Sequence, residues 1–300
     1  MDNYKIEIFD SFSEKLEICW KEFEKDSFHY IFQTFKWQKL WLEKQLEYEK
    51  KITNCTTLVY ENNELIMIMP FNIKNYLNIK ILSWSGFPFS DYNAPLISKK
   101  KQFKKDDFKI IWNKILNKIK SIDCIILDNQ PENIIDQKNP FFIFLKNKIN
   151  NVFFGIEYDK NFKIKKKELD NIRYQTNRLN TLGKLTFKVA KSIEEKKKII
   201  DFIIHNKSKQ YKNTKAWNIF KEKIYLDFFI SSNLVIDQKS YITYLEFDGK
   251  VIAAHSGYTY QKISYYLFPV YDNEFKRYSP GKILLKYIID DAKNNLFDYF

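Results

Sequence analysis

The order of the expected secondary-structure elements occurs twice along the chain. In each half, two amphipathic helices precede a strand–turn–strand pair, and a further helix and a strand-like run follow it. Apolar residues recur at every third or fourth position of the helical segments, as one buried helix face requires. The expected helices are 11–23, 35–46 and 108–120, then 192–211, 217–230 and 281–293, and the strand-like runs are 124–128 and 296–300. This repeated order predicts a tandem duplication of one α/β (α+β) domain.

A β-hairpin marks the equivalent point of each half. The segments TTLVYENNELIMIMPF (56–71) and TYLEFDGKVIAAHSG (243–257) both contain a strand, a polar turn and a strand. Asp248-Gly249 is the stronger turn signal, because a type I′ turn needs positive φ at both central residues. Asn62-Asn63 stands at that place in the first half. We expect a third strand near 263–269 to extend the second hairpin into a meander.

The two domains are expected to cover residues 1–160 and 161–300. Polar stretches between residues 155 and 170 weaken the periodicity there. A helix over 166–181, capped at its end by Gly183, would link the halves. The chain is 45% hydrophobic and 18% aromatic, so each half can bury a core of its own.

The formal charge of +13 raises the question of a nucleic-acid or membrane-surface partner. Arg173, Arg178 and Arg277 are the three arginines among 50 Lys+Arg residues. Basic residues that grip phosphates normally include more arginine, which binds them bidentately. We therefore interpret the basic runs 99–105 and 163–167 as solvated loops and expect no nucleic-acid partner, apart from tRNA under the aminoacyl-transferase alternative given below. Where lysine is the default, a retained arginine indicates a place where an ammonium would not serve.

The sequence favours a cytoplasmic protein without a membrane span or metal site. No apolar run approaches the ~18–20 residues that a membrane helix needs, and the first residues show no secretory signal. Cys19, Cys55 and Cys124 are widely spaced and form no zinc or disulfide pattern.

The segment FKRYSPGKILL (275–285) contains the best candidate for a binding site. Ser279 is a favoured N-cap, and Pro280 suits the first helical position. Gly281 allows close approach to the backbone, and a helix N-terminus attracts anions. Arg277 would add charge-assisted donors. The alternative is an ordinary capped helix with Arg277 at the surface.

This half resembles the GNAT acyltransferase superfamily. There, a loop of Arg/Gln-x-x-Gly-x-Gly/Ala type before a helix wraps the pyrophosphate of coenzyme A, and residues 276–281 (KRYSPG) occupy that place. Ser279 stands where the first glycine usually is.

A closer resemblance is to the CelD-like (cellulose-biosynthesis-type) acetyltransferases, which are related to FemAB-type tandem GNAT proteins. The segments that carry it are FQTFKWQKLW (32–41), LSWSGFPFSDYNAPLI (82–97), HNKSKQY (205–211), IAAHSGYTYQKISYYLFPVYD (252–272), YSPGKILL (278–285) and FDYF (297–300). Family members usually continue beyond the last of these, so we expect a C-terminal truncation or a strand supplied from elsewhere.

The resemblance implies a tandem GNAT-like fold, with two mixed, mostly antiparallel sheets flanked by helices. It also implies transfer of an acyl group from acetyl-CoA or another acyl-CoA. The acceptor would be an amine or hydroxyl of a sugar, a cell-envelope precursor or a small metabolite, as in polysaccharide biosynthesis. The alternatives are a FemAB-like transferase that uses aminoacyl-tRNA and a non-catalytic GNAT-fold binding module.

Several residues are expected to form the site. The expected cofactor contacts are the backbone of Tyr266, Leu267 and Phe268, together with Arg277, Tyr278, Ser279, Gly281 and Lys282. His255 is the candidate base, because its ordinary pKa is near neutrality and small residues share its face; the alternative is a structural histidine. Lys207 is a second catalytic candidate on the acceptor side. Asp91 and Tyr92 are expected to bind substrate, unless Asp91 serves a local Asx turn.

Overall fold

Both predicted hairpins are present in the computed structural model of the chain, which describes residues 3–49, 51–86, 88–144, 164–236, 239–295 and 297–299. Their turns have positive φ at both central residues, which are Asn62 (50°) and Asn63 (67°) in one and Asp248 (45°) and Gly249 (81°) in the other. Type I′ turns require these left-handed angles, which match the twist of the flanking strands. The hairpin prediction is confirmed.

The chain divides into two compact units, Met1–Val152 and Phe153–Phe300. In the N-terminal unit the larger sheet has the strand order β1-β4-β5-β8-β2, and a second sheet has the order β3-β6-β7-β9. The elements of this unit are β1 (Tyr4–Phe9), α1 (Glu14–Lys25), β2 (Ser27–Phe28), η1 (Ile31–Gln33), α2 (Phe35–Tyr48), β3 (Ile52–Asn54), β4 (Thr56–Glu61), β5 (Glu64–Met69), β6 (Phe71–Tyr76), β7 (Ile79–Trp84), β8 (Leu96–Ser98), α3 (Lys105–Lys118), β9 (Cys124–Ile126), β10 (Asn133–Ile134), β11 (Gln137–Lys138) and α4 (Pro140–Phe144).

Aromatic side chains fill the core of the N-terminal unit. Phe71, Phe108 and Phe141 are fully buried in one cluster, between the sheet strands and helices α3 and α4. Trp20 and Phe35 anchor a second cluster, where α1 meets the start of α2. The high aromatic content therefore serves packing in this unit.

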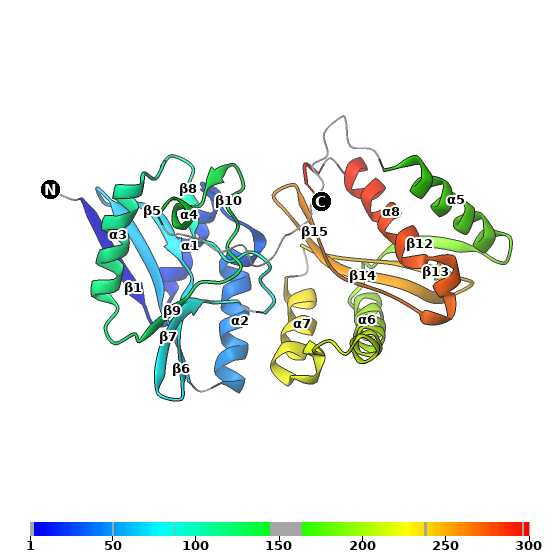
Figure 1. Cartoon of the computed structure of the whole chain (residues 1–300), viewed down its shortest axis with the longest axis horizontal. Coiled ribbons are helices and arrows are strands. Elements are labelled where there is room, and N and C mark those ends of the chain that lie inside the picture. Colours follow the sequence, from blue (N-terminus) through cyan, green and yellow to red (C-terminus); the bar gives the residue numbers. More distant parts are fainter. Residues whose placement is uncertain are drawn as a thin grey trace. The chain divides into compact units, whose positions relative to one another are not determined.

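The C-terminal unit is built on one antiparallel sheet with the order β12-β13-β14-β15. Helices α8 and α5 cover one face of this sheet, and α6 and α7 cover the other (Figure 1). Its elements are α5 (Lys166–Asn180), β12 (Leu185–Val189), α6 (Ile193–Thr214), η2 (Ile219–Lys221), α7 (Lys223–Val235), β13 (Ser240–Phe247), β14 (Lys250–Tyr260), β15 (Ile263–Tyr271), η3 (Asn273–Tyr278) and α8 (Pro280–Asn294). The α8 face is sealed by Ile252 of β14 and by Leu284 and Ile288 of the helix, which are buried together.

The structure corrects two local expectations. Strands β1 and β12 open the sheets of the two units, although the sequence pattern did not single them out. Gly183 is not a left-handed helix cap, since Gly86 and Gly249 are the glycines with positive φ in the described chain. A Cβ at Gly183 would lie 2.0 Å from Asp248 Oδ2, so the hairpin turn excludes a side chain there.

The expected strand at 296–300 is only partly described. Tyr299 forms a single parallel bridge with Ile263 at the start of β15, and the Asp298 N–H donates to the Lys262 carbonyl. Leu296 and Phe300 lie outside the described residues. Within the described ranges, no helix combines the length and apolar character needed to cross a bilayer.

Candidate functional site

Strand β15 is interrupted by a β-bulge. Ser256 of β14 pairs with Phe268, but the next residue, Gly257, pairs with Tyr266, so Leu267 is the extra residue on β15. A bulge bends its strand and disturbs the hydrogen-bond ladder. Because β15 is the last strand in the sheet order, this irregular backbone lies at an edge of the sheet.

The start of α8 differs from the expected N-cap. Ser279 has φ 52° and ψ 46° and makes no side-chain cap bond. A capping hydroxyl normally needs an extended residue, so the left-handed backbone explains why the predicted cap is wrong. This conformation favours glycine, which is the residue the GNAT loop usually has at this position.

The first turn of α8 leaves one backbone donor open. The N–H groups of Lys282 and Ile283 both donate to the Ser279 carbonyl, and Pro280 has no N–H. Among the described residues, none accepts from the Gly281 N–H. This amide and the helix dipole are what the α8 N-terminus offers to an anion.

A cavity of about 530 Å³ joins this helix start to β15 and α6. Its lining is polar along α6 and more apolar along β15 and α8. The lining residues are Asn206, Lys207, Gln210, Asn213, Thr214, Tyr266, Pro269, Val270, Tyr271, Asn273, Lys276, Gly281, Lys282, Leu284 and Leu285. The structure thus brings Lys207, Tyr266, Gly281 and Lys282 of the expected site to one cavity.

Lys207 is the half-buried cation of this cavity. Its Nζ donates to the carbonyl of Pro269, 3.3 Å away on β15, and lies 5.5 Å from the ring centroid of Tyr211. Burial lowers the pKa of Lys207 below that of a free lysine, because the charged form loses hydration. The side chain can therefore give up a proton more readily than a solvated lysine.

His255 lies behind the cavity wall. It is fully buried, is not among the cavity-lining residues of the described chain, and stacks on Tyr266 with ring centroids 4.6 Å apart. The room expected beside Gly257 is filled, since a Cβ there would lie 1.9 Å from the Tyr265 carbonyl oxygen. Burial lowers the pKa of His255 to about 3, so the ring is neutral near pH 7.

Arg277 lies outside the cavity lining. It is exposed, and its guanidinium is 4.8 Å from the ring centroid of Tyr278. Arg178 of α5 lies 5.0 Å from the same centroid. Tyr278 itself is buried in the core beneath α8. Two of the three arginines therefore meet one tyrosine ring, where a planar guanidinium stacks better than an ammonium does.

Asp91 and Tyr92 belong to the N-terminal unit, in the segment between β7 and β8. The Gln33 amide donates to the Tyr92 carbonyl, and the Tyr92 ring packs against Tyr30 and Phe32. Burial raises the pKa of Tyr92 to about 12 and that of Asp91 to about 6. The segments 32–41 and 82–97, which carried the resemblance, are thus in direct contact.

The remaining expected cofactor contacts are spread around the cavity. Phe268 packs its ring on Phe229 of α7, with centroids 4.9 Å apart, while Leu267 is the bulged residue. Lys282 forms an ion pair with Glu168 of α5, 3.0 Å away.

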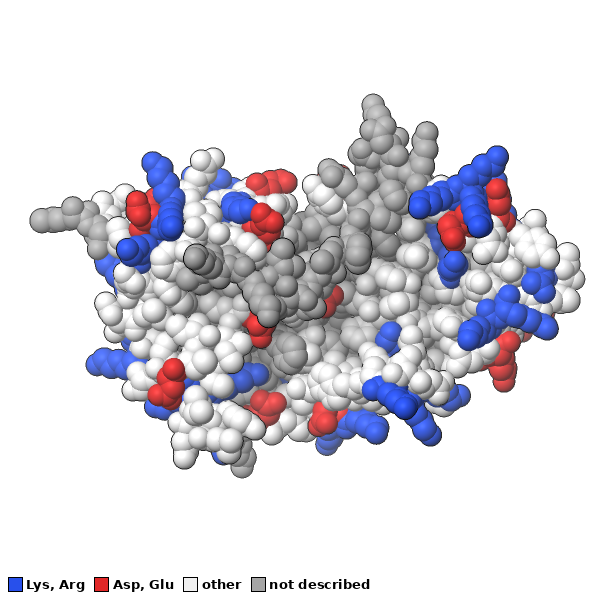
Figure 2. Space-filling view, viewed as in Figure 1, with Lys and Arg blue, Asp and Glu red and all other residues white. Residues whose placement is uncertain are grey.

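On the face seen in Figure 2, lysines are dispersed among carboxylates and form no continuous basic surface.

Sequence reasoning missed the polar face of α6. Asn206, Gln210, Asn213 and Thr214 line the cavity at spacings of four, seven and eight residues from the first, which place them on one helix face. A stripe of amide side chains at this spacing was the available signal. Lys276 and Tyr271 also line the cavity, and the sequence places Lys276 in the 276–281 loop and Tyr271 shortly before it.

Residues 166–300 match the family model of the acetyltransferase (GNAT) domain. The matched segment covers most of the C-terminal unit, which is therefore similar to a GNAT domain. The whole chain is similar in structure to FemX, with a TM-score of 0.60 and 12% identity over 94% of this chain and 86% of FemX. A conserved protein of unknown function from Bacteroides thetaiotaomicron is also similar, with a TM-score of 0.50 and 11% identity over 98% of this chain and 89% of that one.

These findings confirm the predicted fold class and the resemblance to FemAB-like tandem GNAT proteins. At such low identity the likeness to solved structures concerns the fold alone. Among the curated proteins, none matches this sequence at a significant level.

Proposed function

We propose that the GNAT domain transfers an acyl group from acyl-CoA to an amine or hydroxyl acceptor. The observation that carries this proposal is one cavity that runs from the open Gly281 amide to the bulged edge strand. The N-terminus of α8 favours an anion, and the edge strand favours an extended chain. Acyl-CoA combines a diphosphate with a long extended arm that ends in a thioester.

We infer the position of the donor from its chemistry. Its diphosphate would accept from the Gly281 N–H, with Lys276 of η3 supplying positive charge from the cavity wall. Its arm would follow the outer edge of β15 toward Leu267. Backbone N–H groups at the bulge would then stabilise the negative oxygen that forms on the thioester carbon.

The transfer step forms a C–N or C–O bond and breaks the C–S bond. The neutral acceptor attacks the thioester carbonyl, its proton passes to a base, and the thiolate leaves and takes up a proton. Lys207 is the cavity residue best suited to exchange these protons, because burial lowers its pKa and its Nζ lies at the β15 backbone. His255 is excluded from direct contact in this proposal, since it is fully buried.

The acceptor class remains the one expected from the sequence, an amine or hydroxyl of a sugar, a cell-envelope precursor or a small metabolite. Asp91 and Tyr92 are proposed to contact it. Burial raises the pKa of Asp91 to about 6, which suits a carboxyl group that binds a polar ligand inside the protein. Asp91→Asn should raise the KM for the acceptor and leave the affinity for the donor unchanged.

Calorimetric titration of the full chain with acetyl-CoA tests the donor. Binding at micromolar concentration, weakened by Gly281→Ala and unaffected by Asp91→Asn, supports the proposal. Release of free thiol on adding candidate acceptors then tests turnover, with an acceptor-free control to correct for the three free cysteines.

An aminoacyl-tRNA donor is the alternative that the FemAB-type resemblance implies. It would be supported by absence of acetyl-CoA binding together with saturable binding of aminoacyl-tRNA. Binding of neither donor would overturn the transferase proposal and leave a binding module.

A further inference from the structure

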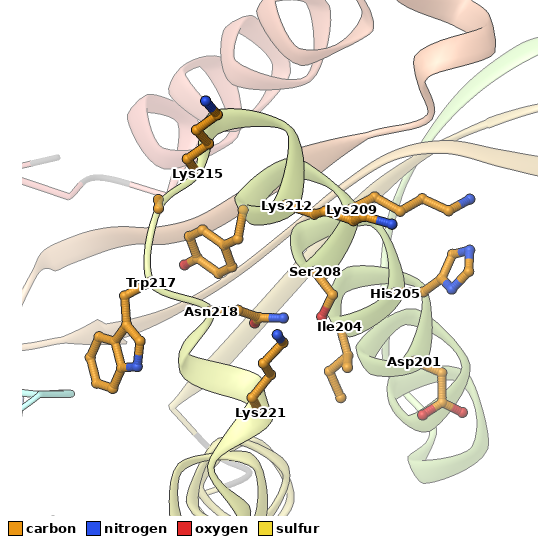
Figure 3. Close-up of a pocket in the computed structure, with 12 residues that line it drawn as sticks. Asp201, Ile204, His205, Ser208, Lys209, Lys212, Lys215, Trp217, Asn218 and Lys221 are labelled. Atoms are coloured by element: carbon orange, nitrogen blue, oxygen red, sulfur yellow. The ribbon is translucent and has the colours of Figure 1, made fainter.

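A second cavity, of about 890 Å³, lies on another side of α6. It is formed by α6, by the connection that follows it and by η2, as Figure 3 shows. The two cavities have no lining residue in common. The proposed donor site therefore does not account for this one.

The second cavity is strongly basic. Lys209, Lys212, Lys215 and Lys221 line it, with Asp201 as its only carboxylate among the described residues. None of the four lysines forms an ion pair with a carboxylate that the structure describes. The charge of Lys209 helps to lower the pKa of Asp272, so Lys212, Lys215 and Lys221 are the cations of this cavity that can act on a ligand.

The helix dipole explains only part of this cluster. Lys212 and Lys215 lie at the C-terminal end of α6, where partial negative charge favours cations. Lys221 does not belong to that helix. It extends from η2 toward α6, beside Asn218 and opposite Ser208 (Figure 3). Positive charge thus reaches the cavity from two separate elements.

An exposed tryptophan lies at the rim of the same cavity. Trp217 leaves 54% of its surface exposed, although burying so large a ring would stabilise the protein. Its orientation is fixed by an edge-on contact with Tyr225, with centroids 5.5 Å apart. Trp217 therefore presents an aromatic ring of fixed orientation, on which a planar group can stack.

We propose that this cavity binds a nucleoside diphosphate or triphosphate. The lysines would hold the phosphates, the base would stack on Trp217, and the Ser208 and Asn218 side chains would bond the sugar or base. The volume is within the range of small-molecule sites, whereas an inorganic anion would leave most of it unused. This assignment is independent of the acyl-transfer proposal.

Calorimetric titration of the full chain with uridine diphosphate tests the site. The same titration is carried out on Gly281→Ala, whose substitution lies in the donor cavity and not in this one. We expect saturable binding that Gly281→Ala leaves unchanged and that weakens as NaCl is raised from about 50 to about 300 mM.

A matched pair of variants separates a specific site from general surface charge. Lys212→Ala/Lys221→Ala removes two cavity lysines, and Lys197→Ala/Lys198→Ala removes two exposed lysines of the same helix that do not line the cavity. The first should weaken uridine diphosphate binding at least about fivefold, and the second by less than about twofold.

A third variant and a second probe test whether the nucleobase stacks on Trp217. Trp217→Ala should weaken uridine diphosphate binding and leave the weaker binding of inorganic pyrophosphate unchanged. The proposal is overturned by absence of binding, by equal losses in the two lysine variants, or by loss of uridine diphosphate binding in Gly281→Ala.

Discussion

Replacement of Gly281 by alanine should make the protein more stable and at the same time impair donor binding. A Cβ built at Gly281 lies 3.4 Å from Tyr271 Cδ1, which is ordinary van der Waals contact, and the backbone φ is not in the left-handed region. Alanine is a better helix former than glycine by up to ~1 kcal/mol. In the first turn we expect a gain of about 0.5 kcal/mol, or about 1–2 °C in Tm.

The same methyl group should obstruct the ligand. Gly281 lines the donor cavity, and its N–H is the open amide of α8, so a Cβ would keep a diphosphate from the backbone. We expect the Kd for acetyl-CoA to rise at least about tenfold, which corresponds to about 1.4 kcal/mol. Thermal unfolding and calorimetric titration measure the two effects on the same preparation.

Gly249→Ala is the matched control. Gly249 has φ 81° in the hairpin turn, and no atom lies within 4 Å of the position that an added Cβ would take, so alanine there is strained by its backbone alone. We expect a loss of ~1 kcal/mol in stability with unchanged donor affinity. If Gly281→Ala binds acetyl-CoA as tightly as the wild type, the assignment of the diphosphate to the α8 N-terminus is wrong.

Three further predictions concern titratable groups. Lys207→Ala should lower kcat at least about a hundredfold and change the donor Kd less than about twofold; equal kcat would remove Lys207 from the mechanism. Burial raises the pKa of Asp91 to about 6, so the folded chain carries the cost of a buried carboxylate once the pH exceeds that value. Asp91→Asn removes this cost and should therefore stabilise the chain at pH 8 by about 1–3 kcal/mol. Urea unfolding should show no such gain below pH 4, where the carboxyl group is protonated. Because burial lowers the pKa of His255 to about 3, the unfolded state binds the proton first and stability falls below pH 6.5. His255→Gln should remove about 2 kcal/mol of the loss between pH 7 and pH 5, and an unchanged pH dependence would contradict the buried neutral state.

Local backbone conformation was largely predictable from the sequence. Asp248-Gly249 and Asn62-Asn63 specify type I′ turns because few other residues tolerate positive φ in succession. Pro280 starts α8 because its fixed φ suits the first helical turn. The amphipathic helices followed from their apolar spacing. Each of these depends on neighbours along the chain.

The composition of the candidate site was less predictable. Ser279 was expected to cap α8 as an ordinary serine, yet it adopts the left-handed backbone because the turn from η3 into α8 sets its angles. Arg277, which the sequence predicts at the cofactor, lies with its guanidinium 4.8 Å from the ring centroid of Tyr278. Lys276, beside it, lines the cavity. Adjacent residues of one loop thus face different surroundings.

The sequence by itself determined the duplicated order of elements, the hairpins and the GNAT resemblance, because these rest on periodicity and on residues a few positions apart. Only the tertiary structure decided that His255 is buried and neutral, and that Lys207 reaches the carbonyl of Pro269 from a helix more than sixty positions earlier. Burial and pKa depend on which distant segments pack around a side chain, and that packing is not written in any local pattern.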